Sequence, residues 1–266
     1  MTYTNISSKD NPLVKQLQKL EKGSGRRKWG RAVVEGAKEV AMALKNGYKV
    51  VQLIVHAQKE LPEWVSRELD ASVALYKMSP DLFNRFCFRK DNSICLAIIE
   101  TQIRPLPATL PHSNALYLII EGIEKPGNLG AILRTADACK ATGVIVCDPV
   151  ADIMNPNTIR SSVGTVFSVP VYSTSAEACV RWLEQHAIKV FTSFIETGAR
   201  PYYKASFEGP CALVLGTEDR GLSAFWRRKE FENIYIPMLG ENDSLNVSVA
   251  AAILAYEARK QKGFEL

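Results

Sequence analysis

Residues 236–261 read IPMLGENDSLNVSVAAAILAYEARKQ, and this stretch joins the end of an apolar strand to a helix. Ser244 or a neighbour is suited to cap that helix. One face of the helix carries an apolar stripe, which fits either the core or a contact between subunits and consists of Leu245, Val249, Ala252, Ile253 and Tyr256. Polar residues that open a mostly apolar helix, here Ser244, Asn246 and Ser248, indicate a ligand or an interface.

Apolar strand patterns alternate with helical patterns upstream of this stretch. Strands are expected at residues 116–121, 143–147, 169–172, 190–195, 212–216 and 234–237, and helices at 128–141, 176–186 and 246–262. Continuous apolar strands interleaved with helices predict a parallel sheet covered on both faces, which makes the C-terminal region a doubly wound α/β domain. Ligands of such domains bind beyond the carboxyl ends of the strands.

Two further junctions after strands are rich in polar residues. EGIEKPGNLGAILRTADA, which starts at residue 121, contains Asn128 as a natural helix cap and Arg134, which can reach back toward it. GTEDRGLS, which starts at residue 216, holds Glu218 between two glycines that let backbone approach a ligand. Taken singly, the first also fits a capping Asn with a surface Arg, and the second an ordinary turn.

A separate domain is expected before residue 101. The segment 101–113, TQIRPLPATLPHS, has three prolines and is typical of an extended linker. Before it, helical patterns at 12–22, 37–46, 61–69 and 80–86 alternate with strand patterns at 32–35, 50–56, 73–77 and 94–99. This alternation predicts a compact α/β domain over residues 1–100, followed by a C-terminal domain over residues 114–266.

The net charge of +5 is unevenly distributed. Residues 1–113 hold 18 Lys and Arg against 11 Asp and Glu, whereas residues 114–266 hold 15 against 17. A basic N-terminal part indicates a polyanion such as nucleic acid, although basic halves also occur in proteins that bind none. Candidate RNA contacts are Arg160 and the basic residues of RRKWGR, namely Arg26, Arg27, Lys28 and Arg31, with a solvated surface loop as the alternative for each.

Composition and motifs exclude several classes. A content of 47% hydrophobic and 23% charged residues is ordinary globular usage. No apolar run approaches the roughly 20 residues that cross a bilayer and no signal peptide pattern is present, so a cytoplasmic location is expected. The six cysteines are expected to be buried free thiols, and no metal site is expected. A dinucleotide fingerprint, a P-loop and a nucleophile elbow are all missing.

Three motifs, taken together and in this order, closely resemble those of the TrmH, or SpoU, family of RNA ribose methyltransferases. They are N-x-G-x-x-x-R (Asn128, Gly130, Arg134), G-x-E-x-x-G (Gly216, Glu218, Gly221) and I-P-M-x-G-x-x-x-S-L-N-V-S (236–248). RAVVEGAKEV, residues 31–40, is similar to the substrate-binding domain of this family. The resemblance therefore spans nearly the whole chain.

The resemblance implies a SPOUT-type fold, in which the end of a parallel sheet is threaded into a deep trefoil knot that forms an S-adenosyl-L-methionine pocket. It also implies a homodimer that packs through this C-terminal domain, and a smaller N-terminal α/β domain that binds RNA. The implied activity is methyl transfer from S-adenosyl-L-methionine to a ribose 2′-hydroxyl of structured RNA. Ribosomal RNA is favoured over tRNA by analogy with family members that carry such an N-terminal domain.

Site residues follow from the same resemblance. Gly216, Ile236 and Leu245 would hold the cofactor, and the reaction site would comprise Asn128, Arg134, Glu218, Ser244 and Asn246. A guanidinium has no acceptor and a pKa above about 12, so we expect Arg134 to orient the 2′-oxygen and stabilise its charge rather than act as a general base. The alternatives are the same chemistry on tRNA, an RNA-binding module without catalysis, and a nucleotide enzyme that lacks the usual fingerprint.

Overall fold

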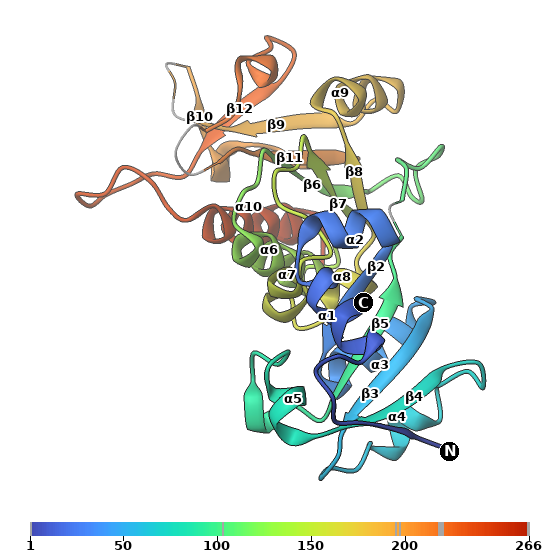
Figure 1. Ribbon diagram of the computed structural model, residues 1–266. Helices are drawn as coiled ribbons and strands as arrows, with labels where there is room; N and C mark the ends of the chain where they lie inside the picture. Colours follow the sequence, from blue (N-terminus) through green and yellow to red (C-terminus); the bar gives the residue numbers. More distant parts are fainter. Residues whose placement is uncertain (1, 103, 195, 197, 218–220, 265–266) are drawn as a thin grey trace. The chain divides into compact units, whose positions relative to one another are not determined.

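The chain divides into two compact units. The computed structural model describes residues 2–102, 104–194, 196, 198–217 and 221–264 (Figure 1). Unit 1 comprises Met1–Gln102 and Asp152–Ser168, and unit 2 comprises Ile103–Ala151 and Val169–Leu266. The first division falls within the segment 101–113, whereas the assignment of residues 152–168 to unit 1 is not predicted by the sequence.

Unit 1 is built on a five-stranded mixed sheet with the strand order β1-β4-β3-β5-β2. Its strands are β1 (Thr4–Ile6), β2 (Arg31–Glu35), β3 (Val50–His56), β4 (Ala74–Met78) and β5 (Cys95–Glu100). Strands β1, β4 and β3 pair in parallel, while β5 runs antiparallel to both β3 and β2. Parallel and antiparallel pairs thus coexist in one sheet.

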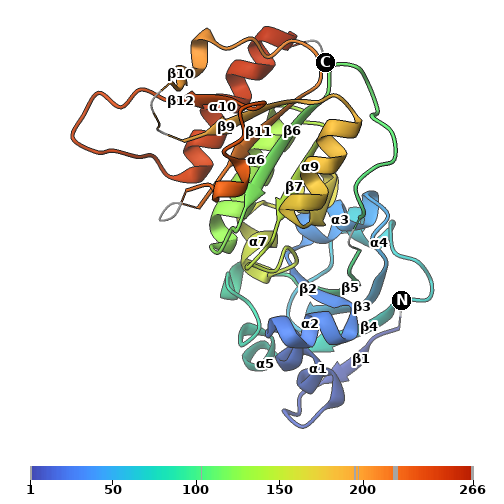
Figure 2. The ribbon, with the colours of Figure 1, turned by 90° about the horizontal axis from the view of Figure 1, so that it is seen from above.

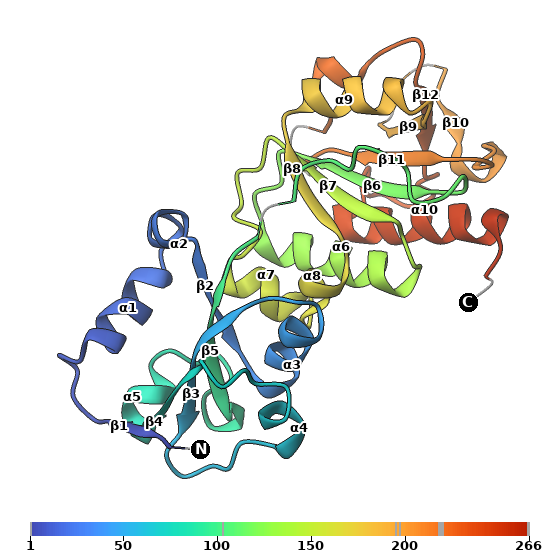
Figure 3. The same ribbon diagram turned by 90° about the vertical axis from the view of Figure 1, so that its right-hand side faces the viewer.

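Helices cover both faces of this sheet. They are α1 (Pro12–Leu20), α2 (Gly23–Trp29), α3 (Ala37–Lys45), α4 (Glu63–Ser66), α5 (Pro80–Asn84), η1 (Lys90–Asn92), α7 (Pro156–Ser161) and α8 (Thr165–Ser168). Helices α1 and α5 bury Leu17 and Phe83 in one apolar cluster with Ile54 and Leu96 of the strands. Helix α3 lies on the opposite face, where it packs against α8 (Figure 3).

Unit 2 contains a seven-stranded sheet with the order β10-β12-β9-β11-β6-β7-β8. Every pairing in it is parallel. The strands are β6 (Leu116–Glu121), β7 (Gly143–Cys147), β8 (Val171–Thr174), β9 (Lys189–Ser193), β10 (Arg200–Pro201), β11 (Cys211–Leu215) and β12 (Glu232–Tyr235). The prediction of a parallel sheet covered by helices is confirmed.

The helices of unit 2 form a layer on each face of this sheet (Figure 3). They are α6 (Pro126–Ala138), α9 (Ala176–Gln185) and α10 (Val247–Lys262), with short 3-10 turns η2 (Tyr202–Lys204) and η3 (Ala224–Trp226). Helices α6 and α10 lie side by side (Figures 2 and 3). Helix α9 covers the other face, where Trp182 packs edge-on against Tyr117. The start of α10 is thereby placed beside the start of α6.

One expectation about helix α6 and one of two alternatives for helix α10 are wrong. Helix α6 begins at Pro126 with Lys125 as its N-cap, because the fixed φ of proline suits the first helical position; Asn128 lies inside the helix. The buried face of α10 consists of Val247, Ala251, Leu254, Ala255 and Ala258. The predicted stripe lies outside this buried face, where Val249 is 45% and Tyr256 is 43% exposed, so its placement in the core is wrong and a contact between subunits stays a prediction.

The six cysteines are free and buried, as predicted. Among the described residues, no helix is both long and apolar enough to cross a membrane. The same part of the chain contains no group of three His, Cys, Asp or Glu side chains arranged to hold a metal ion.

Candidate cofactor and reaction site

The loop after β11 places bare backbone at the carboxyl end of the sheet. Thr217 and Gly221 exchange two backbone hydrogen bonds, of 3.2 and 3.0 Å. A Cβ atom at Gly216 would lie 2.1 Å from the carbonyl carbon of Gly221. Only glycine therefore fits at position 216, because the backbone of Gly221 occupies the space that a side chain would fill.

A cavity of about 290 Å³ lies beside this loop. It brings together the three predicted cofactor residues, Gly216, Ile236 and Leu245, with Ser244 of the predicted reaction site. The rest of its wall is mainly apolar and comes from the ends of β9, β11 and β12 and the start of α10, with Ser193, Phe194, Leu215, Thr217, Gly221, Tyr235, Met238, Asp243, Val247 and Ala250. Apolar walls beside exposed backbone and one carboxylate suit a flat heteroaromatic ligand with a charged tail, so these residues fit S-adenosyl-L-methionine.

A second cavity of about 270 Å³ adjoins the first. The two share Gly216, Thr217 and Val247, and the second is otherwise lined by Asn128, Ile120, Ile123, Glu124 and Lys125. Two small molecules bound in these cavities would meet at the shared residues. This is the geometry that transfer of a group between two bound partners requires.

Asn128 and Asn246 connect the starts of the two neighbouring helices. Asn246 caps α10, because its Oδ1 accepts hydrogen bonds from the backbone nitrogen of Ser248 at 2.9 Å and from the Ser248 hydroxyl at 2.6 Å. Its Nδ2 donates to Oδ1 of Asn128 at 3.3 Å. The cap fixes which way the Asn246 amide points, and the amide in turn orients the Asn128 side chain toward the second cavity.

Arg134 lies away from this pair. It is exposed on α6 and lines neither of the two cavities. Glu218 lies outside the described residues. The structure thus brings together Asn128, Asn246 and Ser244 around the two cavities, and it leaves Arg134 on the adjoining surface.

Among the candidate RNA contacts in unit 1, Arg26 is buried. Its Nε donates to Oδ2 of Asp152 at 2.6 Å, and its Nη1 donates to the carbonyl oxygens of Leu20 and Glu21, both at 2.8 Å. With only 4% of its surface exposed, Arg26 connects three parts of unit 1 and does not offer its guanidinium to a polyanion. The sequence-based expectation for this residue is therefore replaced by a structural role.

The other basic candidates are accessible to different degrees. Arg27 and Lys28 are exposed on α2, and Arg31 is half-buried at the start of β2. Arg160, on α7, is half-buried, and its guanidinium carbon lies 3.7 Å from the centre of the Phe88 ring. Sequence reasoning missed Phe88, although basic and aromatic residues alternate around it in RFCFRK, residues 85–90.

Comparison with known proteins agrees with this geometry. Residues 115–256 match the model of the SpoU rRNA Methylase family, and residues 11–97 match the MRM3-like substrate binding domain. The first match covers more than half of the chain. The chain therefore belongs to the SpoU rRNA methylase family.

Individual relatives extend over nearly the full length. A 23S rRNA (guanosine(2553)-2′-O)-methyltransferase, RlmP of Bacillus subtilis, is 32% identical over 96% of this chain and 98% of its own length. A 23S rRNA (uridine(2479)-2′-O)-methyltransferase of Streptomyces viridochromogenes is 32% identical over 88% of this chain and 84% of its own. The crystal structure of an AdoMet-bound rRNA methyltransferase from Sinorhizobium meliloti superposes with a TM-score of 0.87 at 29% identity, covering 97% of this chain and 98% of that one.

Proposed function

We propose that this protein transfers the methyl group of S-adenosyl-L-methionine to a ribose 2′-hydroxyl of ribosomal RNA. The observation that carries the proposal is the pair of adjoining cavities that share Gly216, Thr217 and Val247. Relatives that match almost end to end are named as 23S rRNA 2′-O-methyltransferases, on guanosine in one case and uridine in another. The proposal therefore extends to the ribose hydroxyl and not to one base.

In this proposal the first cavity holds the cofactor. Backbone at Gly216 would approach the ligand closely, and Ile236 and Leu245 would contact its adenine. When bound, the cofactor supplies an electrophilic methyl group on a sulfonium. The residues of the chain then act mainly by holding the ribose hydroxyl in line with that methyl group, and such positioning can lower a barrier by about 7 to 11 kcal/mol.

The second cavity would receive the target ribose. Asn128 faces it with an amide whose orientation Asn246 fixes, and Ser244 borders the adjoining cavity. Arg134, exposed on α6, has five N–H donors that can orient the 2′-oxygen and stabilise its charge as the proton leaves. Glu218 completes the proposed reaction site on the strength of the motif it belongs to.

The assembly and the location of the protein are part of the same proposal. The open side of α10, with Val249 and Tyr256, would pack against a second copy to form a homodimer. We further propose that the chain between β12 and α10 is threaded as a deep trefoil knot, that the basic half collects RNA, and that the enzyme acts in the cytoplasm without a metal ion.

Two measurements test the function. Calorimetry with S-adenosyl-L-methionine should give saturable heat, whereas its absence would favour an RNA-binding module without catalysis. Mapping of 2′-O-methyl groups in RNA from cells with and without the gene should then reveal a site in rRNA that depends on the gene. A dependent site in tRNA alone would overturn the choice of substrate and leave the chemistry intact.

A further inference from the structure

Phe88 is a large apolar side chain that unit 1 holds in solvent. It is 66% exposed, and Arg85, Arg89 and Lys90 around it are also exposed. Single exposed apolar residues are common, so exposure by itself indicates nothing. Phe88 differs from such residues because hydrogen bonds hold its backbone in place and a guanidinium group covers one face of its ring.

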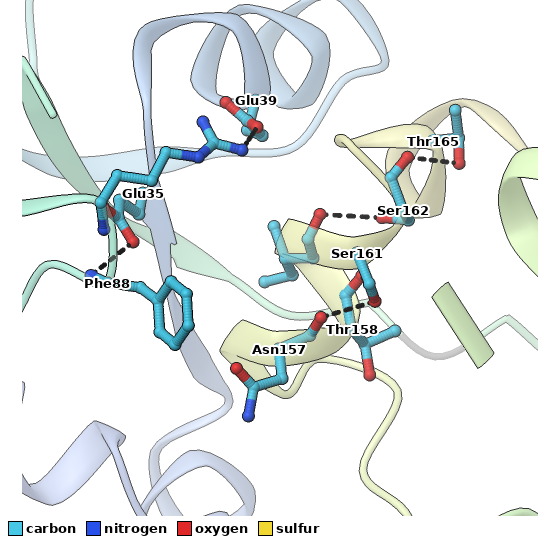
Figure 4. Close-up of polar contacts among 10 residues, drawn as sticks. Glu35, Glu39, Phe88, Asn157, Thr158, Ser161, Ser162 and Thr165 are labelled. Atoms are coloured by element: carbon cyan, nitrogen blue, oxygen red, sulfur yellow. Dashed lines mark hydrogen bonds and ion pairs between the residues drawn. The ribbon is translucent and has the colours of Figure 1, made fainter. Parts of the chain in front are cut away.

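Glu35 fixes the backbone on both sides of this ring. Its two carboxylate oxygens accept hydrogen bonds from the backbone nitrogens of Phe88 and Arg89, each at 2.9 Å (Figure 4). Arg89 is held a second time, because its Nη2 donates to Oε1 of Glu39 at 2.7 Å and Glu39 is 1% exposed. The carboxylates of Glu35 and Glu39 are therefore engaged by the loop that carries Phe88.

Arg160 covers one face of the Phe88 ring. Its guanidinium carbon lies 3.7 Å from the ring centre, which is within the range of a cation–π contact. Helix α7, toward which the ring points in Figure 4, is itself fixed, since Asn155 caps it by accepting from the backbone nitrogen of Asn157 at 2.9 Å. The hydrogen bonding of the guanidinium is weak, because its Nη2 reaches Oδ1 of Asn157 only at 3.4 Å and its buried Nε has no hydrogen-bond partner among the described residues.

A cavity of about 250 Å³ opens beside this pair. Its apolar wall includes Leu17 and Val33. Its charged lining consists of Arg85 and Arg160 together with Glu21 and Glu35, of which Glu35 is already engaged by the backbone of Phe88 and Arg89. Pockets for drug-sized ligands run from about 300 to 1,000 Å³, so this cavity suits one flat ring system and not a larger molecule. An aromatic side chain, an apolar wall and two guanidinium groups therefore surround a space of the size of a nucleobase.

We propose that this cavity binds one unpaired nucleotide of the RNA substrate, with its base stacked on Phe88 and its phosphate on Arg85 and Arg160. The inference rests on the proposed function, because it names the part of the RNA that unit 1 holds. Proteins read RNA chiefly through splayed-out bases that stack on aromatic rings and on arginine planes. Glu21, which borders the same cavity, can accept a hydrogen bond from the base.

The test uses the full chain and a single-stranded RNA nonamer with a central 2-aminopurine, whose fluorescence falls when the base stacks. The wild-type protein should quench the probe. Phe88→Leu, which keeps an apolar side chain but removes the ring, should bind at least about 5-fold more weakly and lose the quenching, since stacking is worth about 1–3 kcal/mol per base. Phe88→Tyr, which keeps the ring, should bind within about 2-fold of wild type.

Controls separate stacking from charge and from folding. Trp64→Leu removes another exposed aromatic ring of unit 1, 52% exposed, and should leave binding unchanged. A fully paired RNA duplex offers no unstacked base, so Phe88→Leu should bind it like wild type. Arg160→Lys keeps the charge but loses the planar guanidinium, and it should weaken probe binding. The double variant Arg160→Lys with Phe88→Leu should lose less binding free energy than the sum of the two single losses, because the two side chains are in contact.

Failure of this inference differs from failure of the proposed function. If Phe88→Leu quenches and binds the probe like wild type, or if the wild type does not quench it, the nucleotide site is wrong. The heat of binding of S-adenosyl-L-methionine reports on unit 2, and it should be the same for wild type and for Phe88→Leu. With rRNA as substrate, Phe88→Leu should raise KM and leave kcat unchanged.

Discussion

The two units use α/β architecture in different ways. In unit 2 every strand pairing is parallel, and both candidate cavities lie where strands end and helices begin. In unit 1 the sheet is mixed, and the candidate groups lie on helix surfaces and on a loop held by Glu35. In a parallel sheet a site is expected beyond the carboxyl ends of the strands, whereas a mixed sheet gives no such expectation.

The sharpest test of unit 2 concerns Arg134, which is exposed on α6. Arg134→Ala should lower kcat by about 10²–10³-fold, because it removes the donors that we propose for the developing charge, while calorimetry should give unchanged cofactor affinity. Arg181→Ala, at another exposed position, on α9, where Arg181 pairs with Glu177 at 2.6 Å, is the matched control and should retain activity. Loss of activity in both variants, or in neither, would remove Arg134 from the site.

Arg134→Lys distinguishes the two roles considered for this residue. An orienting and stabilising group should give a slower enzyme whose pH–rate profile keeps its shape, because a lysine ammonium lacks the planar fork of the guanidinium. Full activity with a shifted limb of the profile would instead indicate a titrating base.

Gly216→Ala should weaken binding of S-adenosyl-L-methionine by about 100-fold, since overpacking against backbone costs about 1–3 kcal/mol or more. The clash is with the backbone of Gly221, 2.1 Å from the added Cβ, and rotation of a side chain cannot relieve it. Gly240→Ala is the control, because a Cβ there meets nothing within 4 Å. Calorimetry on both variants reads the difference directly, and equal affinities would show that the loop after β11 does not form the cofactor site.

Arg26 and Arg27 are neighbours in sequence that should behave oppositely. Arg26→Ala leaves Asp152 and two carbonyl groups without their donor, and it should destabilise unit 1 by about 3 kcal/mol in urea unfolding followed by hydrogen exchange of α2. Arg27→Ala should leave stability unchanged and reduce RNA affinity a few-fold, with a smaller salt dependence. A stable Arg26→Ala protein would contradict the role assigned to this residue.

The smallest effect concerns alkaline pH. Burial raises the pKa of the Cys95 thiol from its ordinary value of 9.0 to about 12, with smaller contributions from Glu39 and Cys87. Above pH 9 the unfolded chain loses this proton while the folded chain keeps it, so stability is full below pH 9 and falls as the pH rises toward 12. Between pH 8 and 10.5 the free energy of unfolding of Cys95→Ala should fall less than that of wild type, by about 2 kcal/mol at most. Urea unfolding of both proteins across this range measures the difference, and an equal fall in both would show that the Cys95 thiol does not titrate differently in the folded and unfolded chains.

The sequence predicts strands best where the apolar run is continuous. Strands β3, β6 and β7 have the bounds expected from residues 50–56, 116–121 and 143–147, because buried strands leave no polar interruption. The core alternative for the apolar stripe of α10 is wrong because the helix has apolar residues on both sides, and pattern alone does not rank Val247 above Val249.

Side-chain roles are harder to predict than strands. The resemblance groups Gly216, Ile236 and Leu245 as cofactor residues and Ser244 as a reaction-site residue, and all four line one cavity. Their chemical roles stay a prediction. The role of Arg26 escaped prediction because its partner, Asp152, is 126 residues away in sequence. The contact between Phe88 and Arg160 likewise joins residues that lie 72 positions apart in the sequence.

The assignment of Asp152–Ser168 to unit 1 has a consequence for synthesis on the ribosome. Chains emerge from the amino terminus, and domains generally fold as units in that order. Here Phe167, which packs edge-on against Tyr48, and Asp152, which pairs with Arg26, arrive only after strands β6 and β7 have been made. Unit 1, the first to begin folding, can therefore be completed only after the chain has been made up to residue 168, and a fragment ending at residue 102 would lack part of its own core.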